Sequence, residues 1–164
     1  EAAVLRGLLR EVRQMLEGRA AEAPDDELAE ITGIRLGPTK RPADRIVARL
    51  LPDFTFEDPD LAAGLRSLHE PQLIAAKLEV NQHMLDTLPP DGGRVELRPE
   101  AADEWLTGLN DIRLALGTAL DVSEDMPDEL PPDDPRAEHM GVYQWLTFVQ
   151  DSLVHARMAV REKR

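Results

Sequence analysis

The chain has 164 residues, 42% apolar and 31% charged, a balance that suits a single globular domain and excludes a wholly disordered chain. Its net charge of −13 repels nucleic-acid phosphates and attracts basic proteins, although many proteins are acidic for solubility alone. The absence of cysteine excludes disulfides, thiolate metal sites and thiol switches within these residues.

Composition favours helices over sheet. Aromatic residues make up only 4% of the chain, whereas strands draw on aromatic and β-branched residues. Charged residues interrupt every apolar run, so we expect no membrane span, and no signal peptide is visible. We therefore expect a cytoplasmic, mainly α protein.

Apolar stripes of helical period predict an irregular bundle of four main helices with additional short ones. The first main helix should end near Ala21, and short helices should follow from Asp25–Asp26 and over Pro42 to Leu51. The other main helices are expected in three places: from Asp58 to about Leu88, with a kink or a fresh start at Pro71; from Pro99 to about Leu120; and over roughly Arg136 to Arg161.

One short strand is expected at Arg94–Arg98, where polar and apolar residues alternate after the turn signal Asp91–Gly92–Gly93. A lone strand is unstable without a partner. No other segment offers one in an obvious place, so the partner is expected upstream of Glu1.

No combination of residues predicts catalysis, a cofactor or a metal ion. His69–Glu70 lacks the second histidine of an HExxH motif, and the other histidines do not have zinc-ligand spacing. Ser152 and His155 lie three residues apart on an expected helix, but no third catalytic group accompanies them. We therefore expect a protein that is not an enzyme.

An acidic, proline-rich run follows the third main helix and is predicted to be an exposed loop. The run lacks the regular spacing of oxygen ligands, the central glycine and the terminal glutamate of a calcium-binding EF-hand loop. The alternatives are a solubilising linker and a surface that attracts a basic partner. The candidate partner-binding residues are Asp125, Asp128, Glu129, Asp133 and Asp134.

Asn110, Asp111 and Arg113 interrupt an otherwise apolar helix. Asn and Asp lower helix propensity, so contacts outside the helix should compensate. We interpret the group as a structural polar strut between helices, with a ligand site as the alternative.

Two basic clusters break the acidity. One surrounds a proline-rich loop and the other ends the chain, where it also suits the negative end of a helix dipole. Neither contains the aromatic residues of a nucleic-acid stacking platform. The first comprises Arg35, Lys40, Arg41, Arg45 and Arg49, and the second Arg157, Arg161, Lys163 and Arg164.

Four segments of the sequence, in this order along the chain, are similar to a known protein family. They are EAAVLRGLL at Glu1–Leu9, RSLHEPQL at Arg66–Leu73, EWLTGLNDIRLALGTAL at Glu104–Leu120 and VYQWLTFVQDSL at Val142–Leu153. Together they resemble a family of actinobacterial proteins known as a domain of unknown function. The likeness covers nearly the whole chain, and Leu109–Gly117 is its most specific block.

Members of that family usually begin with an additional extended segment. The resemblance therefore implies that residues 1–164 form one helical domain that lacks this segment. The family includes an actinomycete oxidative-stress regulator thought to cooperate with a stress sigma factor. The genes of this family typically lie beside the gene for the Clp protease adaptor and near cysteine-biosynthesis genes.

The resemblance implies a stress-response transcriptional regulator that binds a sigma factor or RNA polymerase. The alternative is an accessory factor for Clp-dependent proteolysis or cysteine metabolism. Charge disfavours direct DNA binding, although the Arg clusters leave it open. A regulator that senses oxidants through its own thiols needs cysteine. Either the sensing cysteine lies in a missing N-terminal segment, or this member does not sense oxidants directly.

Overall fold

The computed structural model describes residues 1–24, 35–127, 130–131 and 133–161, and these form a mainly α fold. The described helices are α1 (Ala2–Ala20), α3 (Arg45–Leu50), α4 (Pro59–Thr87), α5 (Pro99–Ala119) and α6 (Ala137–Arg161). Four long helices and the short α3 confirm the predicted helical class. The helix expected from Asp25–Asp26 lies outside the described residues.

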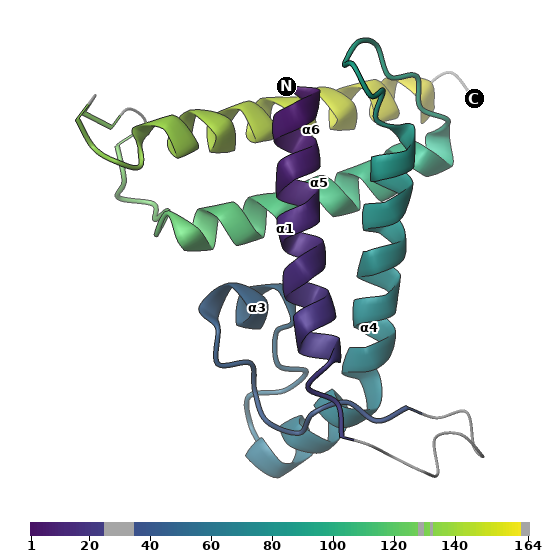
Figure 1. Ribbon diagram of the computed structural model, residues 1–164, viewed down its shortest axis with the longest axis vertical. Coiled ribbons are helices and arrows are strands. Elements are labelled where there is room, and N and C mark those ends of the chain that lie inside the picture. The colour runs from purple at the N-terminus through teal and green to yellow at the C-terminus, as the bar shows by residue number, and fades with distance from the viewer. Residues whose placement is uncertain (25–34, 128–129, 132, 162–164) are drawn as a thin grey trace.

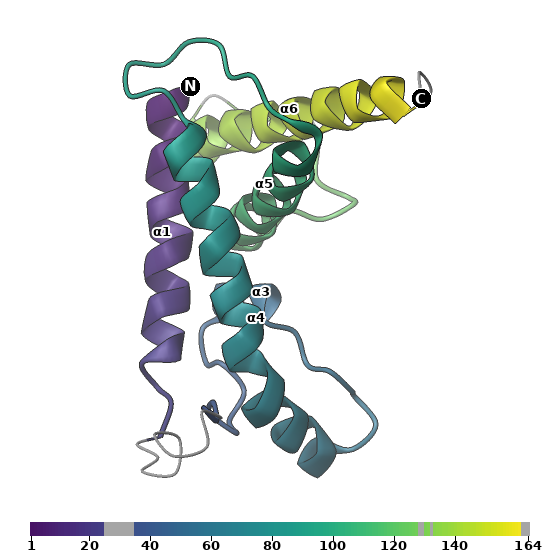
Figure 2. The same cartoon turned by 90° about the vertical axis from the view of Figure 1, so that its right-hand side faces the viewer.

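Two antiparallel helix pairs cross each other (Figures 1 and 2). In Figure 1, α1 and α4 stand upright side by side, while α5 and α6 run across them. The central helix is α5, because it alone among the described helices packs against each of the other four. By contrast, α5 is the one described helix with which α6 makes close backbone contact.

The core lies where α5 meets the other helices. Leu9 and Leu16 of α1, Leu109 of α5 and Leu146 of α6 are fully buried there. Complete burial of such a side chain stabilises the fold by about 1.5–3 kcal/mol. No described helix is both long enough and apolar enough to cross a lipid bilayer.

Aspartate side chains fix where two helices begin. The Asp44 carboxylate accepts hydrogen bonds from the backbone N–H groups of Ile46 and Val47, at 2.8 and 2.9 Å. Asp58 caps α4 in the same way, with Pro59 in the first turn. Such caps satisfy N–H groups that have no partner within the helix, and each contributes about 1 kcal/mol.

Pro71 lies inside α4 without ending it. A proline has no N–H to donate, so the carbonyl four residues earlier, that of Ser67, loses its helical partner. The backbone N–H of Gly37 donates to that carbonyl instead, at 2.7 Å. A Cβ on residue 37 would lie 3.0 Å from the Pro71 ring, so glycine permits this close approach. The helix continues because another segment uses the freed carbonyl.

The strand predicted at Arg94–Arg98 is wrong, because this segment has no regular secondary structure. Val95 and Leu97 are half-buried and pack against the helical core, while Arg94, Glu96 and Arg98 are exposed. The alternation of polar and apolar residues therefore marks a connection between α4 and α5 in which every second side chain packs against the helices.

Candidate interaction surfaces

Asp111 forms a buried ion pair that joins α4 to α5. Its Oδ1 lies 2.6 Å from the Nζ of Lys77, and the two side chains are only 7% and 15% exposed. Taking two charges out of water is costly, and close geometry is needed to offset that cost. The position between two helices is that expected of a strut, and its contribution to stability stays a prediction.

Arg113 faces the opposite neighbour, α6. Its Nη1 donates to the Oε1 of Gln150 at 2.6 Å, and its guanidinium lies 5.4 Å from the centre of the Tyr143 ring. The Nε of Arg113 is buried and makes no hydrogen bond to any residue that the structure describes. Asn110 is exposed. The structure therefore separates the three residues: Asp111 faces α4, Arg113 faces α6 and Asn110 faces solvent.

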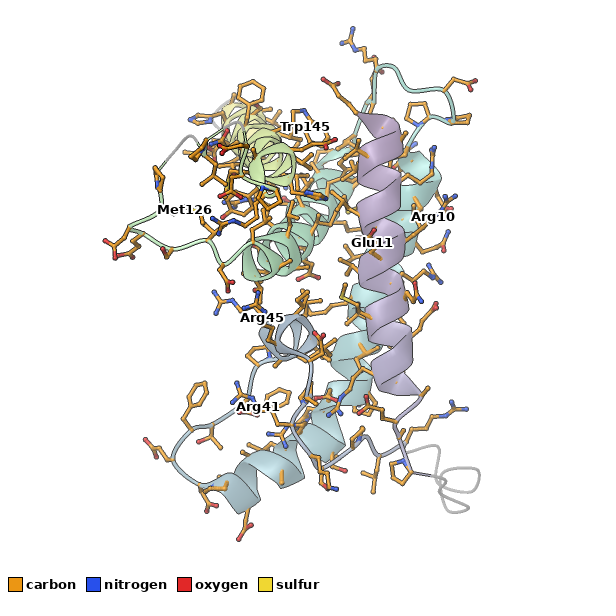
Figure 3. The ribbon with its side chains drawn as sticks, turned by 60° about the vertical axis from the view of Figure 1, so that its left-hand side comes forward. Arg10, Glu11, Arg41, Arg45, Met126 and Trp145 are labelled. Carbon is orange, nitrogen blue, oxygen red and sulfur yellow. The ribbon has the colours of Figure 1, made fainter. Side chains whose placement is uncertain are left out.

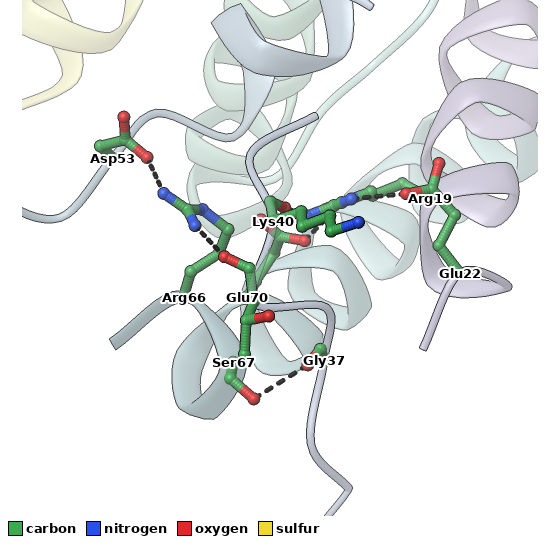
Figure 4. A network of polar contacts seen from close by, with 9 residues as sticks. Arg19, Glu22, Gly37, Lys40, Asp53, Arg66, Ser67 and Glu70 are labelled. Atoms are coloured by element: carbon green, nitrogen blue, oxygen red, sulfur yellow. Dashed lines mark hydrogen bonds and ion pairs between the residues drawn. The ribbon is translucent and has the colours of Figure 1, made fainter. Parts of the chain in front are cut away.

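A second buried ion pair, between Arg19 and Glu70, was not predicted from the sequence (Figure 4). The Nε of Arg19 lies 2.6 Å from a Glu70 carboxylate oxygen, and both side chains are 2% exposed. The same guanidinium donates to Glu22 at 2.5 Å and to the backbone carbonyl of Lys40 at 2.6 Å. One side chain thus joins α1 and α4 to the loop before α3.

Further contacts fasten this loop to α4 (Figure 4). Arg66 donates to the carbonyl of Thr39 and forms an ion pair with Asp53. The hydroxyl of Ser67 donates to the carbonyl of Gly37 at 2.9 Å. These hydrogen bonds hold the backbone on both sides of α3 and so set the position of the first basic cluster.

Arg41, Arg45 and Arg49 of that cluster line a groove of about 480 Å³ between α3, the following loop and Thr118 of α5. A second cavity of about 280 Å³ shares Arg49 and Thr118 with it and extends to Arg113 and Tyr143. The two cavities adjoin at Arg49 and Thr118, and we call them together the arginine groove. Figure 3 shows Arg41 and Arg45 on the same side of the molecule, whereas Arg10 projects from the far side of α1.

The acidic loop divides into exposed and anchored positions. Asp125 and Asp133 are exposed, whereas Asp128 and Glu129 lie outside the described residues. The Asp134 carboxylate accepts from the backbone N–H of Arg136 at 2.8 Å and pairs with its guanidinium at 2.9 Å. This hydrogen bonding holds the pKa of Asp134 below its usual value. Asp134 therefore helps to fix the start of α6.

The outer face of α6 is partly apolar. Phe148, Val154 and Met158 are 69%, 38% and 55% exposed. Of the C-terminal basic cluster, Arg157 forms an ion pair with Asp103 of α5 at 2.8 Å. Lys163 and Arg164 lie outside the described residues, as does the Arg161 side chain.

No group of three or more His, Asp or Glu side chains in the described part of the chain is placed to hold a metal ion. The Nδ1 of His83 lies 3.1 Å from a Glu104 oxygen, and His69 packs against Phe54 with ring centres 5.7 Å apart. The Nδ1 of His155 contacts the Asp151 carbonyl at 2.7 Å, and in the described structure no hydrogen bond joins the side chains of Ser152 and His155.

Comparison with known proteins gives one family. The family described as a domain of unknown function (DUF2017) matches residues 1–157. The chain is 44% identical to the oxidative stress regulator AosR of Mycobacterium tuberculosis strain H37Rv over 174 residues, covering 98% of this chain and 80% of that protein. Identity and coverage are the same for the Mycobacterium bovis protein of that name, and the Mycobacterium leprae counterpart is 43% identical, covering 97% of this chain and 79% of its own. No solved structure matches significantly.

Proposed function

This chain belongs to the DUF2017 family, and we propose that it is a stress-response regulator that acts by binding a protein partner. The observation that carries this proposal is the 44% identity, across 98% of the chain, to proteins named as oxidative stress regulators. The family match over residues 1–157 spans α1, α3, α4, α5 and most of α6.

Binding rather than catalysis is supported by how the buried polar groups are used. Arg19 is paired with Glu70, and Lys77 with Asp111, in contacts of 2.6 Å that join helices. Charges committed to such pairs hold the scaffold and are not free to act as acids, bases or nucleophiles.

We propose a sigma factor or another component of RNA polymerase as the partner. The net charge of −13 supports this choice, because sigma factors present basic DNA-binding surfaces and opposite charges accelerate encounter. The exposed carboxylates of Asp125 and Asp133 lie where such a surface could approach without disturbing the core.

Affinity capture from an actinobacterial lysate, with and without oxidant stress, tests the proposal. Captured proteins should be identified by mass spectrometry and then rebound in purified form. We expect a sigma factor or polymerase subunit to bind the purified chain directly. Direct binding of Clp components alone would instead favour an accessory role in proteolysis, and the proposed partner would be wrong.

A further inference from the structure

The arginine groove gathers positive charge on the surface of a strongly acidic protein. Arg41 has its nearest acid, Asp53, at 3.5 Å, and Arg45 pairs with Asp121 at 2.5 Å. The arginine side chains of these pairs are 61% and 57% exposed, and exposed ion pairs are weak enough for another carboxylate to compete. Arg49 is exposed, and its side chain makes no hydrogen bond or ion pair with any residue of the described ranges.

We propose that the arginine groove binds an acidic segment of a protein partner in an extended conformation. This goes beyond the proposed function, because the groove selects the opposite charge from the acidic loop and is a separate surface. A failure here would leave the regulatory proposal untouched.

The spacing of the arginines favours an extended peptide. Arg45 and Arg49 lie four residues apart on α3, so their Cα atoms are about 6 Å apart along the helix axis. In an extended chain, alternate side chains point to the same side and are about 6.6 Å apart. Carboxylates at alternate positions of such a peptide therefore repeat at about the spacing at which the two arginines leave the helix. Arginine can also bind a carboxylate with two parallel hydrogen bonds, which would strengthen the binding of a peptide with this spacing.

The two ends of the groove favour a longer peptide over a small anion. At one end, Phe56 is 83% exposed and offers an apolar contact beside the charges. At the other end, Arg113 is held by Gln150 and Tyr143, so little conformational freedom is lost when it contacts a ligand. A segment that combines acidic residues with an apolar one would use both ends.

Fluorescence anisotropy with labelled synthetic peptides tests the proposal. The probe is an extended peptide with glutamate at alternate positions and one phenylalanine. Its controls replace each glutamate with glutamine or space the glutamates three apart. The protein variants are Arg49→Ala and the double variant Arg45→Ala/Arg49→Ala. Arg10→Ala serves as the matched control, because it removes an exposed arginine from α1 outside the groove.

We expect the alternating glutamate peptide to bind wild type more tightly than either control peptide. Arg49→Ala should weaken binding about three- to tenfold, and the double variant should weaken it further. The reason is that a hydrogen bond between two charged groups is stronger than one between neutral groups. Arg10→Ala should bind as wild type does, and all variants should keep the wild-type circular dichroism. Equal losses in Arg10→Ala and Arg49→Ala, or equal affinity for the glutamine peptide, would overturn the proposal. Complete displacement by millimolar inorganic phosphate would assign the groove to small anions instead.

Discussion

The buried pair between Asp111 and Lys77 gives a prediction at the scale of single residues. Asp111→Ala leaves the ammonium group of Lys77 in a largely buried position without its carboxylate, which is 2.6 Å away in the native protein. Breaking a buried pair from one side is strongly destabilising. We expect the free energy of unfolding to fall by about 2–4 kcal/mol, as measured by urea denaturation.

Two further variants show whether the loss of stability comes from the unpaired charge of Lys77 or from any substitution at this place in α5. Asn110→Ala changes the adjacent exposed residue and should alter stability by no more than about 0.5 kcal/mol. The double variant Lys77→Met/Asp111→Leu removes both charges and should recover most of the lost stability. If Asp111→Ala unfolds like wild type but no longer binds the partner, Asp111 belongs to a recognition surface and the structural interpretation is wrong.

Individual polar contacts were only partly predictable from the sequence. Asn110, Asp111 and Arg113 stand out because they interrupt an apolar helix, but their neighbours lie on two different helices that no local pattern specifies. Arg19 and Glu70 are 51 positions apart, and their pairing depends on the antiparallel packing of α1 and α4. One signal was available: Arg19 continues the buried stripe of Leu9, Val12 and Leu16, where a charged residue needs a partner.

At the scale of elements, Gly108 allows α5 to approach α4 closely. A Cβ on this residue would overlap the sulfur of Met84, which is fully buried. Gly108→Ala should therefore force core side chains to move and lower the free energy of unfolding by about 1–3 kcal/mol. Chemical denaturation measures this change.

Gly141 provides the matched control in α6, because a Cβ there would meet no atom within 4 Å outside its chain neighbours and its own helix backbone. Replacing a helical glycine with alanine reduces the conformational freedom lost on folding. Gly141→Ala should raise the free energy of unfolding by about 0.5–1 kcal/mol. If both substitutions stabilise the protein, the contact between α4 and α5 tolerates a methyl group and the packing argument fails.

The acidic loop should affect how fast a basic partner associates. Replacing Asp125, Asp128, Glu129 and Asp133 with their amides should slow association several-fold at low salt and leave dissociation nearly unchanged. Asp134 is kept, because it fixes the start of α6. Stopped-flow or surface-based kinetics at several salt concentrations with the purified partner measure both rates.

A control variant separates the position of these charges from their number. Neutralising Glu11, Glu57, Glu79 and Asp151 changes the net charge by the same amount at exposed sites elsewhere. Association should slow less in this control than in the loop variant. Equal slowing would assign the effect to overall charge, and no slowing in either would make the loop a solubilising linker.

The extents of the helices followed well from apolar periodicity and capping residues. The predicted starts at Asp58 and Pro99 match α4 and α5, since an N-cap and a first-turn proline are local features. Pro71 shows the limit of such reasoning. Its effect depends on whether another segment can use the carbonyl of Ser67, and that segment, around Gly37, lies 30 residues away.

At the scale of the whole molecule, the sequence predicted a helical bundle but not which helices pair. Apolar stripes do not specify partners, and the buried face of α4 is mixed, because it includes Arg66, Glu70 and Asn81. The exposure of Phe148 was likewise unpredicted, because α6 packs closely on one helix only and leaves apolar residues on its outer face.

The central position of α5 has a consequence for how the chain folds as it is synthesised. α1 and α3 leave the ribosome first, yet both pack against α5, which ends 69 positions after α3. At about 5–20 residues per second, this interval lasts several seconds. During that time α1 can pack only against α3 and the emerging α4, and α3 lacks α5, its main partner. A nascent chain stalled before Pro99 should therefore expose the faces that α5 later covers, and chaperones would bind it there.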